Sequence, residues 1–314
     1  MRLINAEKKN RNMNTGSVNL RHSAPTLSRV IAMTKRGKLC ILAAVSAALL
    51  LGGALIYFHD DMTQKHIEDS VIKYKPTLAV RNELDKITSD MITETAALKD
   101  TNSESATETE AGEIPVISAS DTLPDNVRQS LIDSVQALHS AYPDCIGWLY
   151  IPDTSIDEPV MRCNDNDYYL NHAFEGSSLQ AGSVFLDCRC EGRFMNPINI
   201  LYSHNMRNGS MFADIPKYSE ESYFEAHKYG WLATPETVYR IDFFSCAKAG
   251  WKDLLYDGGT LLSEWIPHIF DCSAVSREIT YSDEDRFISL STCSYEFQNA
   301  RTILTGKLTE TNGG

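Results

Sequence analysis

The longest uninterrupted hydrophobic run of the chain lies close to its N-terminus. Residues 39–58 read LCILAAVSAALLLGGALIYF and contain no charged side chain. A helix of this length is about 30 Å long, which is the thickness of the hydrocarbon layer of a bilayer. The pattern predicts a transmembrane anchor. The alternatives are a buried helix of a soluble domain and a cleaved signal peptide. The apolar region of a signal peptide usually has about 7–15 residues and ends in small residues, whereas this run ends in Leu-Ile-Tyr-Phe.

Charged residues are distributed unevenly on the two sides of this run. Residues 1–38 contain nine basic residues and one acid, a net charge of +8, whereas residues 59–314 contain 20 basic and 41 acidic residues, a net charge of −21. Because positively charged flanks stay inside the cell, we predict a cytoplasmic basic tail over 1–38, a single-pass membrane anchor over 39–58 and an extracytoplasmic part over 59–314. The whole chain has a net charge of −13, which argues against nucleic acid as a partner.

Residues 59–123 are predicted to form an extracytoplasmic stalk and linker. Between His66 and Leu98 the apolar residues are mostly spaced by three, four or seven positions, which is typical of an amphipathic helix, and Pro76 interrupts it. We expect an exposed helical stalk here rather than a coiled coil. Residues 100–112 read DTNSESATETEAG and are too polar to form a core, so they are expected to be a flexible spacer.

Residues 124–314 have a different pattern of apolar residues, which predicts a folded catalytic-sized domain. Residues 125–142 have apolar positions at helical spacing, and Pro143 ends this predicted helix. A further helix is expected within 253–270. The domain is therefore mainly β with helices, and its sheet is a barrel or a sandwich. Short apolar runs separated by turn residues predict seven strands, over 146–151, 158–161, 182–187, 198–203, 237–247, 286–293 and 301–308.

The chain has eight cysteines, of which one, Cys40, lies in the apolar run. The other seven are extracytoplasmic by this interpretation, and an odd number leaves at least one without a partner in the chain. Three disulfides and a set of buried thiols both stay open. Cys188 and Cys190 are closely spaced, but no second pair with the spacing of a zinc site accompanies them. We therefore expect no metal and no cofactor.

Three side chains are candidates for catalysis. Cys293 and His204 each lie at the end of a predicted strand, and Arg301 begins the strand that follows Cys293. A turn near residues 298–299 brings Arg301 back towards Cys293. A thiol needs a nearby base or cation to become a nucleophilic thiolate, and a cation also stabilises a developing oxyanion. Taken singly, each residue has an ordinary structural interpretation, as a core thiol, a loop histidine and a solvated arginine.

The sequence around these residues resembles a known enzyme family. Residues 289–293, Ser-Leu-Ser-Thr-Cys, followed by Arg301, resemble the sortase signature Thr-Leu-x-Thr-Cys with an Arg eight residues later. Residues 201–206, Leu-Tyr-Ser-His-Asn-Met, are similar to the Leu-Tyr-Gly-His-Asn-Met motif of class B sortases. In each motif one residue differs, Ser for Thr and Ser for Gly. Residues 145–152, 156–161 and 167–174 are similar to the opening of the same catalytic domain, so the likeness covers about residues 124–310.

The resemblance implies a fold and an activity. The fold is a closed eight-stranded β-barrel with an N-terminal helix and a helix inserted before the last strands. The activity is that of a membrane-anchored cysteine transpeptidase at the surface of a Gram-positive bacterium. Cys293 forms a thioacyl-enzyme at a Thr of an Asn-Pro-x-Thr-like sorting signal, and a peptidoglycan-precursor amine then accepts the acyl group. By the same likeness, His204 is the general acid and base, and Arg301 holds either the carbonyl oxygen or the peptide backbone of the substrate.

The resemblance also implies lesser roles and leaves alternatives open. Thr292 and Asn171 are expected to bind substrate. A pilin-polymerising sortase and a hydrolytic cysteine peptidase (a thiol protease) on the same scaffold are alternative functions. A surface adhesin or structural module with a vestigial site is a further alternative.

Overall fold

The structure is a computed structural model that describes residues 35–103, 122–294 and 299–313. The chain divides into two compact units, Met1–Tyr57 and Phe58–Gly314. The predicted cytoplasmic tail, up to residue 34, lies outside the described residues, as does the predicted spacer from residue 104 onwards. Gln298, in the predicted turn, also lies outside them. The second unit contains every strand that the structure describes and all the candidate catalytic residues.

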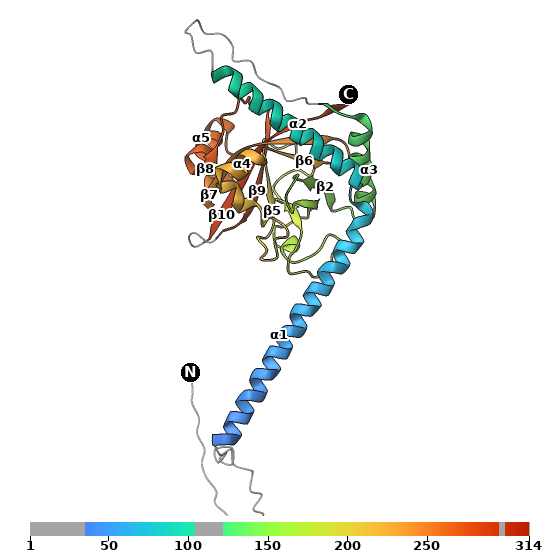
Figure 1. Ribbon diagram of the computed structural model, residues 1–314, viewed down its shortest axis with the longest axis vertical. Helices are drawn as coiled ribbons and strands as arrows, with labels where there is room; N and C mark the ends of the chain where they lie inside the picture. The colour runs from blue at the N-terminus through green and yellow to red at the C-terminus, as the bar shows by residue number, and fades with distance from the viewer. Residues whose placement is uncertain (1–34, 104–121, 295–298, 314) are drawn as a thin grey trace, which may run out of the picture. The chain divides into compact units, whose positions relative to one another are not determined.

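A closed β-barrel forms the second unit (Figure 1). The strand order around the barrel is β10-β9-β5-β4-β3-β2-β6-β7, and β7 pairs with β10 to close it. The pairs β3–β4 and β5–β9 are parallel, and the other neighbours are antiparallel. The eight-stranded barrel with helices is therefore confirmed. The barrel strands are β2 (Cys145–Tyr150), β3 (Asp157–Met161), β4 (Val184–Leu186), β5 (Ile198–Tyr202), β6 (Tyr229–Ala233), β7 (Val238–Gly250), β9 (Arg286–Cys293) and β10 (Ala300–Glu310).

Three short strands lie outside the barrel. β8 (Ser273–Ser276) adds to β7 in the antiparallel direction. β1 (Thr122–Leu123) and β11 (Asn312–Gly313) form a two-residue parallel pair. Seven barrel strands follow the predicted runs, whereas β6 was not predicted, because its sequence YGWLA is short and almost continuously apolar.

Helices cover the barrel at separate places. α3 (Asp125–Ala141) is the predicted N-terminal helix, and its apolar positions are buried against the barrel near β2. α5 (Leu262–Cys272) is the predicted late helix, and it forms a second core in which Trp265 contacts Phe287 of β9. The remaining short helices are α4 (Glu221–Ala226) and the 3-10 turns η2 (Ile72–Tyr74), η3 (Tyr168–Leu170), η4 (Ile215–Ser219) and η5 (Leu254–Tyr256).

The helices that precede the barrel differ from the predicted exposed stalk. α1 (Lys35–Val71) ends before Pro76 and α2 (Leu78–Ser103) begins after it, as the spacing indicated. However, α2 packs on the barrel (Figure 1). Leu84 is fully buried, and the indole N–H of Trp231 in β6 donates to the Thr88 hydroxyl at 3.0 Å. The correction has a simple cause: an apolar helix face must be covered, and the barrel covers this one.

The predicted membrane anchor, residues 39–58, lies within α1. Over the residues that the structure describes, no helix is both long enough and apolar enough to cross a bilayer. The prediction of an anchor is not confirmed by this structure.

The docking of α2 on the barrel predicts a position-dependent loss of stability. Leu84→Ala leaves a cavity in the core and should lower the free energy of unfolding by about 2–5 kcal/mol. The matched control is Leu78→Ala at the start of the same helix, where the side chain is 65% exposed and little should change. Urea unfolding of a fragment containing residues 58–314 measures both. Equal, small effects of the two substitutions would mean that α2 is not docked in solution.

Candidate active site

The parallel pairing of β5 with β9 determines which residues meet at one end of the barrel. Tyr202 of β5 pairs with Ser291 of β9, so His204 and Cys293 each lie two residues beyond this pair. Because parallel strands end at the same edge of a sheet, the two residues come together there. The two residues are 89 positions apart in the sequence, so only the pairing of β5 with β9 explains why they lie close together.

Three hydrogen bonds hold the His204 loop against the end of β9. The backbone N–H of Ser203 donates to Ser291 O at 3.3 Å. The Thr292 hydroxyl donates to Ser203 O at 2.9 Å, and the Asn205 side-chain amide donates to Cys293 O at 3.1 Å. The two residues that flank His204 are therefore hydrogen-bonded to the last three residues of β9, which limits how far the histidine can move from the thiol.

The antiparallel pairing of β9 with β10 brings in the arginine. Arg301 is the register partner of Cys293. Residues directly opposite each other on antiparallel strands point to the same face, with Cβ atoms about 4.5–5.5 Å apart. The guanidinium, which has five fixed donors, thus belongs to the same face of the sheet as the thiol. The predicted return of Arg301 towards Cys293 is the result of this register.

Cys293, His204 and Arg301 all line one cleft of about 710 Å³. Thr292 also lines it, although the side chain is buried and its hydroxyl is used in the bond to Ser203. Asn171 is exposed and is not among the lining residues, whereas its neighbour Leu170 is. The substrate-binding roles of Thr292 and Asn171 stay predictions.

The hydrogen bond of His204 assigns its protons. His204 Nε2 lies 2.7 Å from the backbone carbonyl oxygen of Leu170, at the end of η3. A carbonyl oxygen only accepts, so Nε2 carries a proton and Nδ1 is the basic nitrogen of the neutral ring. The ring can then take up and release a second proton at Nδ1 while the bond to Leu170 keeps its orientation.

A buried carboxylate organises the wall of the cleft. Asp187 is fully buried, accepts two hydrogen bonds from the Arg189 guanidinium at 2.9 and 2.7 Å, and accepts a third from the Tyr202 hydroxyl at 2.9 Å. Burial by itself raises the pKa of Asp187, but these hydrogen bonds outweigh it, so the pKa lies below the ordinary value of 3.8. The aspartate is therefore charged at neutral pH and fixes Arg189 and Tyr202, which both line the cleft.

A second tyrosine continues this wall towards β9. The Tyr256 ring of η5 stacks on Tyr202 with centroids 6.2 Å apart, and its hydroxyl is 2.7 Å from the Ser291 hydroxyl. Burial raises the pKa of Tyr256 to about 12, so it is a neutral hydrogen-bonding group near pH 7. Arg189 also donates to Tyr256 O at 2.9 Å. The wall beside Cys293 is thus a connected polar network.

Sequence reasoning missed several residues that line the cleft. Tyr202 and Ser291 lie inside the two motifs that identified His204 and Cys293, so their positions were available as a signal. Trp251 and Tyr256 come from the segment after β7, where no motif points to a site.

The cysteines divide into one cleft thiol and others elsewhere. The free thiols of the barrel unit include six cysteines, namely Cys145, Cys163, Cys188, Cys190, Cys272 and Cys293, and Cys246 forms no disulfide. Of these, Cys293 alone lines the cleft. Burial raises the pKa of Cys145 to about 12, which makes it an unreactive core thiol. Three disulfides, which the count of cysteines allowed, are not formed by these six.

The chain is similar in sequence and in structure to known proteins of one enzyme family. Sortase B of Listeria monocytogenes is 32% identical over 194 residues, which cover 60% of this chain and 79% of that protein. The crystal structure of a Streptococcus pyogenes class B sortase involved in pilus biogenesis has 30% identity and a TM-score of 0.52, covering 55% of this chain and 96% of that one. A Staphylococcus aureus sortase B–substrate complex has 25% identity and a TM-score of 0.54, covering 58% of this chain and 87% of that one. No protein-family model matches the chain.

The buried carboxylate in the cleft wall predicts a pH-dependent stability. Asp187→Asn should lower the free energy of unfolding by about 1–3 kcal/mol at pH 7, because it weakens charge-assisted hydrogen bonds. A carboxyl whose pKa is lowered by folding contributes stability above its unfolded pKa, and this contribution is lost as the pH falls from that value through the folded pKa. The difference between wild type and variant should therefore be constant above about pH 5 and shrink below pH 3.8.

Urea unfolding at pH 7, 5 and 3 measures this difference. Asp133→Asn, which changes an exposed carboxylate on α3, is the matched control and should have little effect at any of these values. A difference that stays unchanged down to pH 3 would contradict the lowered pKa of Asp187.

Proposed function

This chain belongs to the class B sortases, and from that premise we propose that it cleaves the sorting signal of a secreted protein at a Thr and transfers the protein to a cell-wall amine. Sortases are cysteine transpeptidases, and the general activity follows from the family. The observation that carries the finer proposal is the register at the end of β9, which sets Cys293 opposite Arg301 and beside the loop of His204.

In the first half of the proposed reaction, the Cys293 thiolate attacks the carbonyl carbon of the Thr residue. The negative charge that develops on the carbonyl oxygen is stabilised by the N–H donors of Arg301. The C–N bond then breaks, and His204 gives the proton on Nδ1 to the leaving amine. The product is a thioester between Cys293 and the secreted protein.

In the second half, an amine of a peptidoglycan precursor attacks the thioester carbon. His204 Nδ1 accepts the proton that the amine loses, the new amide forms, and Cys293 leaves as a thiolate. His204 returns to its protonated form, so protons and electrons balance over the cycle. Throughout, the N–H at Nε2 stays bonded to Leu170 O, which keeps the ring in one orientation.

The catalytic roles predict the effect of four substitutions on kcat/KM for a peptide carrying an Asn-Pro-x-Thr-like signal. Cys293→Ala should abolish turnover, and His204→Ala should lower it by about 10²–10⁴-fold. Arg301→Ala should lower it by about 10²–10³-fold. Arg301→Lys should recover little, because a point charge does not replace a planar fork of donors.

The measurement is peptide cleavage with and without an added amine, followed by analysis of the products. Amine-dependent ligation supports a transpeptidase, hydrolysis that ignores the amine supports the peptidase alternative, and ligation only to a pilin lysine supports polymerisation. Cys163→Ala, which removes a half-buried free cysteine away from the cleft, is the control and should keep full activity. Normal rates for Arg301→Ala would remove this residue from the mechanism.

The chain is further proposed to be anchored in the cell membrane by residues 39–58, with the N-terminus in the cytoplasm. What supports this is the uncharged run itself and the net charge of +8 that precedes it. An enzyme held this way meets secreted proteins as they emerge and cell-wall precursors at the outer leaflet.

The anchor predicts which part of the chain an external protease can reach. In intact protoplasts, added protease should release the catalytic domain and leave a membrane-bound N-terminal fragment that is detected through a tag on residue 1. Replacing Leu49 and Leu50 by Asp should abolish membrane retention, because charges in the apolar layer are costly. Recovery of the wild-type protein from the culture medium, cut near residue 58, would contradict the anchor.

A further inference from the structure

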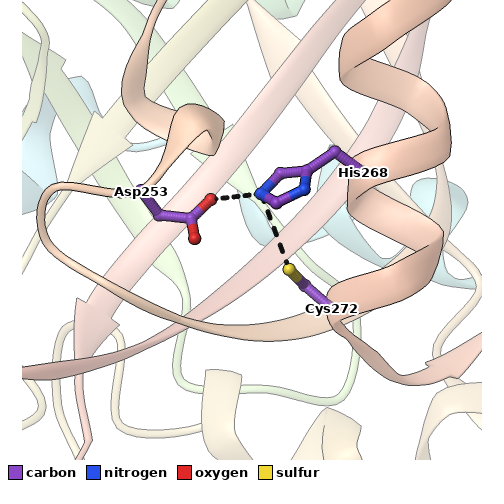
Figure 2. A group of neighbouring side chains, drawn as sticks. All are labelled: Asp253, His268 and Cys272. Atoms are coloured by element: carbon purple, nitrogen blue, oxygen red, sulfur yellow. Dashed lines mark hydrogen bonds and ion pairs between the residues drawn. The ribbon is translucent and has the colours of Figure 1, made fainter.

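A second thiol lies in a cluster that the proposed reaction does not use. Cys272 and His268 occupy positions i+4 and i on α5, so they share one face of the helix. Asp253 approaches them from the segment that follows β7, as Figure 2 shows. The candidate ligand atoms of the three side chains all lie within 4.8 Å of one another.

The geometry of the cluster is not that of a catalytic triad. In a triad the histidine uses one ring nitrogen for the carboxylate and the other for the nucleophile. Here a single nitrogen faces both partners, since His268 Nε2 lies 2.6 Å from Asp253 Oδ1 and 3.7 Å from Cys272 Sγ (Figure 2). A proton cannot be relayed through the ring in this arrangement, so activation of Cys272 as a nucleophile is not supported.

Three donor atoms that converge on one point are what a metal ion requires. Tetrahedral zinc, with Zn–S near 2.3 Å and Zn–N near 2.0–2.1 Å, separates sulfur and nitrogen by about 3.5 Å and nitrogen and oxygen by about 3.3 Å. The observed S···N distance of 3.7 Å matches the first value. The observed N···O distance of 2.6 Å must widen by roughly 0.7 Å. A small rotation of the Asp253 side chain supplies this.

Asp253 has the freedom to rotate without losing its structural role. Its Oδ1 accepts a hydrogen bond from the backbone N–H of Leu255 at 3.0 Å, which caps η5. Each carboxylate oxygen has two lone pairs, so Oδ1 can keep this bond through one lone pair and bind a cation with the other. The side chains of His268 and Asp253 are 32% and 24% exposed, which leaves room for a water in the fourth coordination position.

We propose that Asp253, His268 and Cys272 bind one Zn²⁺ ion, with water as the fourth ligand. The donor set selects this class of metal: thiolate and imidazole suit zinc, whereas Ca²⁺ and Mg²⁺ take oxygen ligands. On binding, the thiol of Cys272 loses its proton to solvent, because the thiolate is the ligand. The site uses a thiol other than Cys293, and the proposal does not depend on the transpeptidation reaction.

The location of the site indicates what bound zinc does. Asp253 both lines the cleft and precedes η5, and Tyr256 at the end of η5 is part of the cleft wall. A metal bridge from Asp253 to α5 therefore ties that wall to a helix whose core side chains, Trp265 and Ile269, are fully buried. Zinc is expected to stabilise the wall and raise the melting temperature of the protein.

Cobalt titration of the metal-free full-length chain tests the site directly. Co²⁺ occupies zinc sites, and its bond to a thiolate gives a charge-transfer absorption that nitrogen and oxygen ligands do not give. We expect this band to saturate at one Co²⁺ per chain and to be displaced by Zn²⁺. Cys272→Ser should abolish the band, and Asp253→Asn and His268→Ala should each weaken Co²⁺ binding by at least about tenfold.

Two controls assign the band to the correct thiol. Cys293→Ser removes the cleft thiol and Cys163→Ser removes another half-buried thiol, and both should keep the band unchanged. If Cys272→Ser fails to fold, Cys272→His keeps a ligand at the position, and Zn²⁺ should still raise its melting temperature while the thiolate band is lost. Absence of a thiolate band in excess Co²⁺, or its loss in Cys293→Ser and not in Cys272→Ser, would overturn the proposal and leave Asp253–His268 as an ion pair.

Discussion

The register of β9 with its two neighbours is the constraint on which the site depends. β9 pairs in parallel with β5 and antiparallel with β10, so its end is aligned with two different segments: Ser291 pairs with Tyr202 of β5, and Cys293 pairs with Arg301 of β10. Side chains alternate between the faces of a strand, so a slip by one residue would turn Cys293 away from Arg301. β9 is almost entirely buried, and burying the correct face of its apolar residues is what excludes such a slip.

The barrel core and the polar wall of the cleft stabilise the position of β9 in different ways. Trp265 of α5 packs on Phe287 at the beginning of β9, and this contact holds the first residues of the strand in place. At the other end, Asp187 fixes Tyr202 and Arg189 through hydrogen bonds that a buried carboxylate must have to remain charged. Packing therefore determines where the strand runs, and the charged network determines how the cleft side chains are oriented.

Most helices and strands could be predicted from the sequence, because each prediction used the spacing of apolar residues within one short segment. The helices α3 and α5 and seven barrel strands follow apolar spacing and turn residues. Closure between β7 and β10 came from the family resemblance, since pairing between distant segments has no local signal. The docking of α2 was missed for the same reason: spacing reveals that Leu84 belongs to an apolar face, but not what covers that face.

The candidate site could be predicted in part for the same physical reason. His204, Cys293 and Arg301 lie in or beside motifs at strand ends, and the cleft contains all three. Asn171 was chosen by likeness within a loop, and its neighbour Leu170 is the residue that reaches the cleft and holds His204. The cluster of Asp253, His268 and Cys272 was overlooked because His-x-x-x-Cys on a helix offers two ligands, and the third comes from another segment.

Closure of the barrel has a consequence for an enzyme that handles other polypeptides. A peptide in extended form can add to any open edge of a sheet, and such unplanned pairing leads to aggregation. The β7–β10 pairing removes the two long edges that an open sheet would offer, and in the described part of the chain the strands outside the barrel have only two to four residues. In the part of the chain that the structure describes, an incoming polypeptide thus finds no long ladder of free backbone groups on the wall of the barrel.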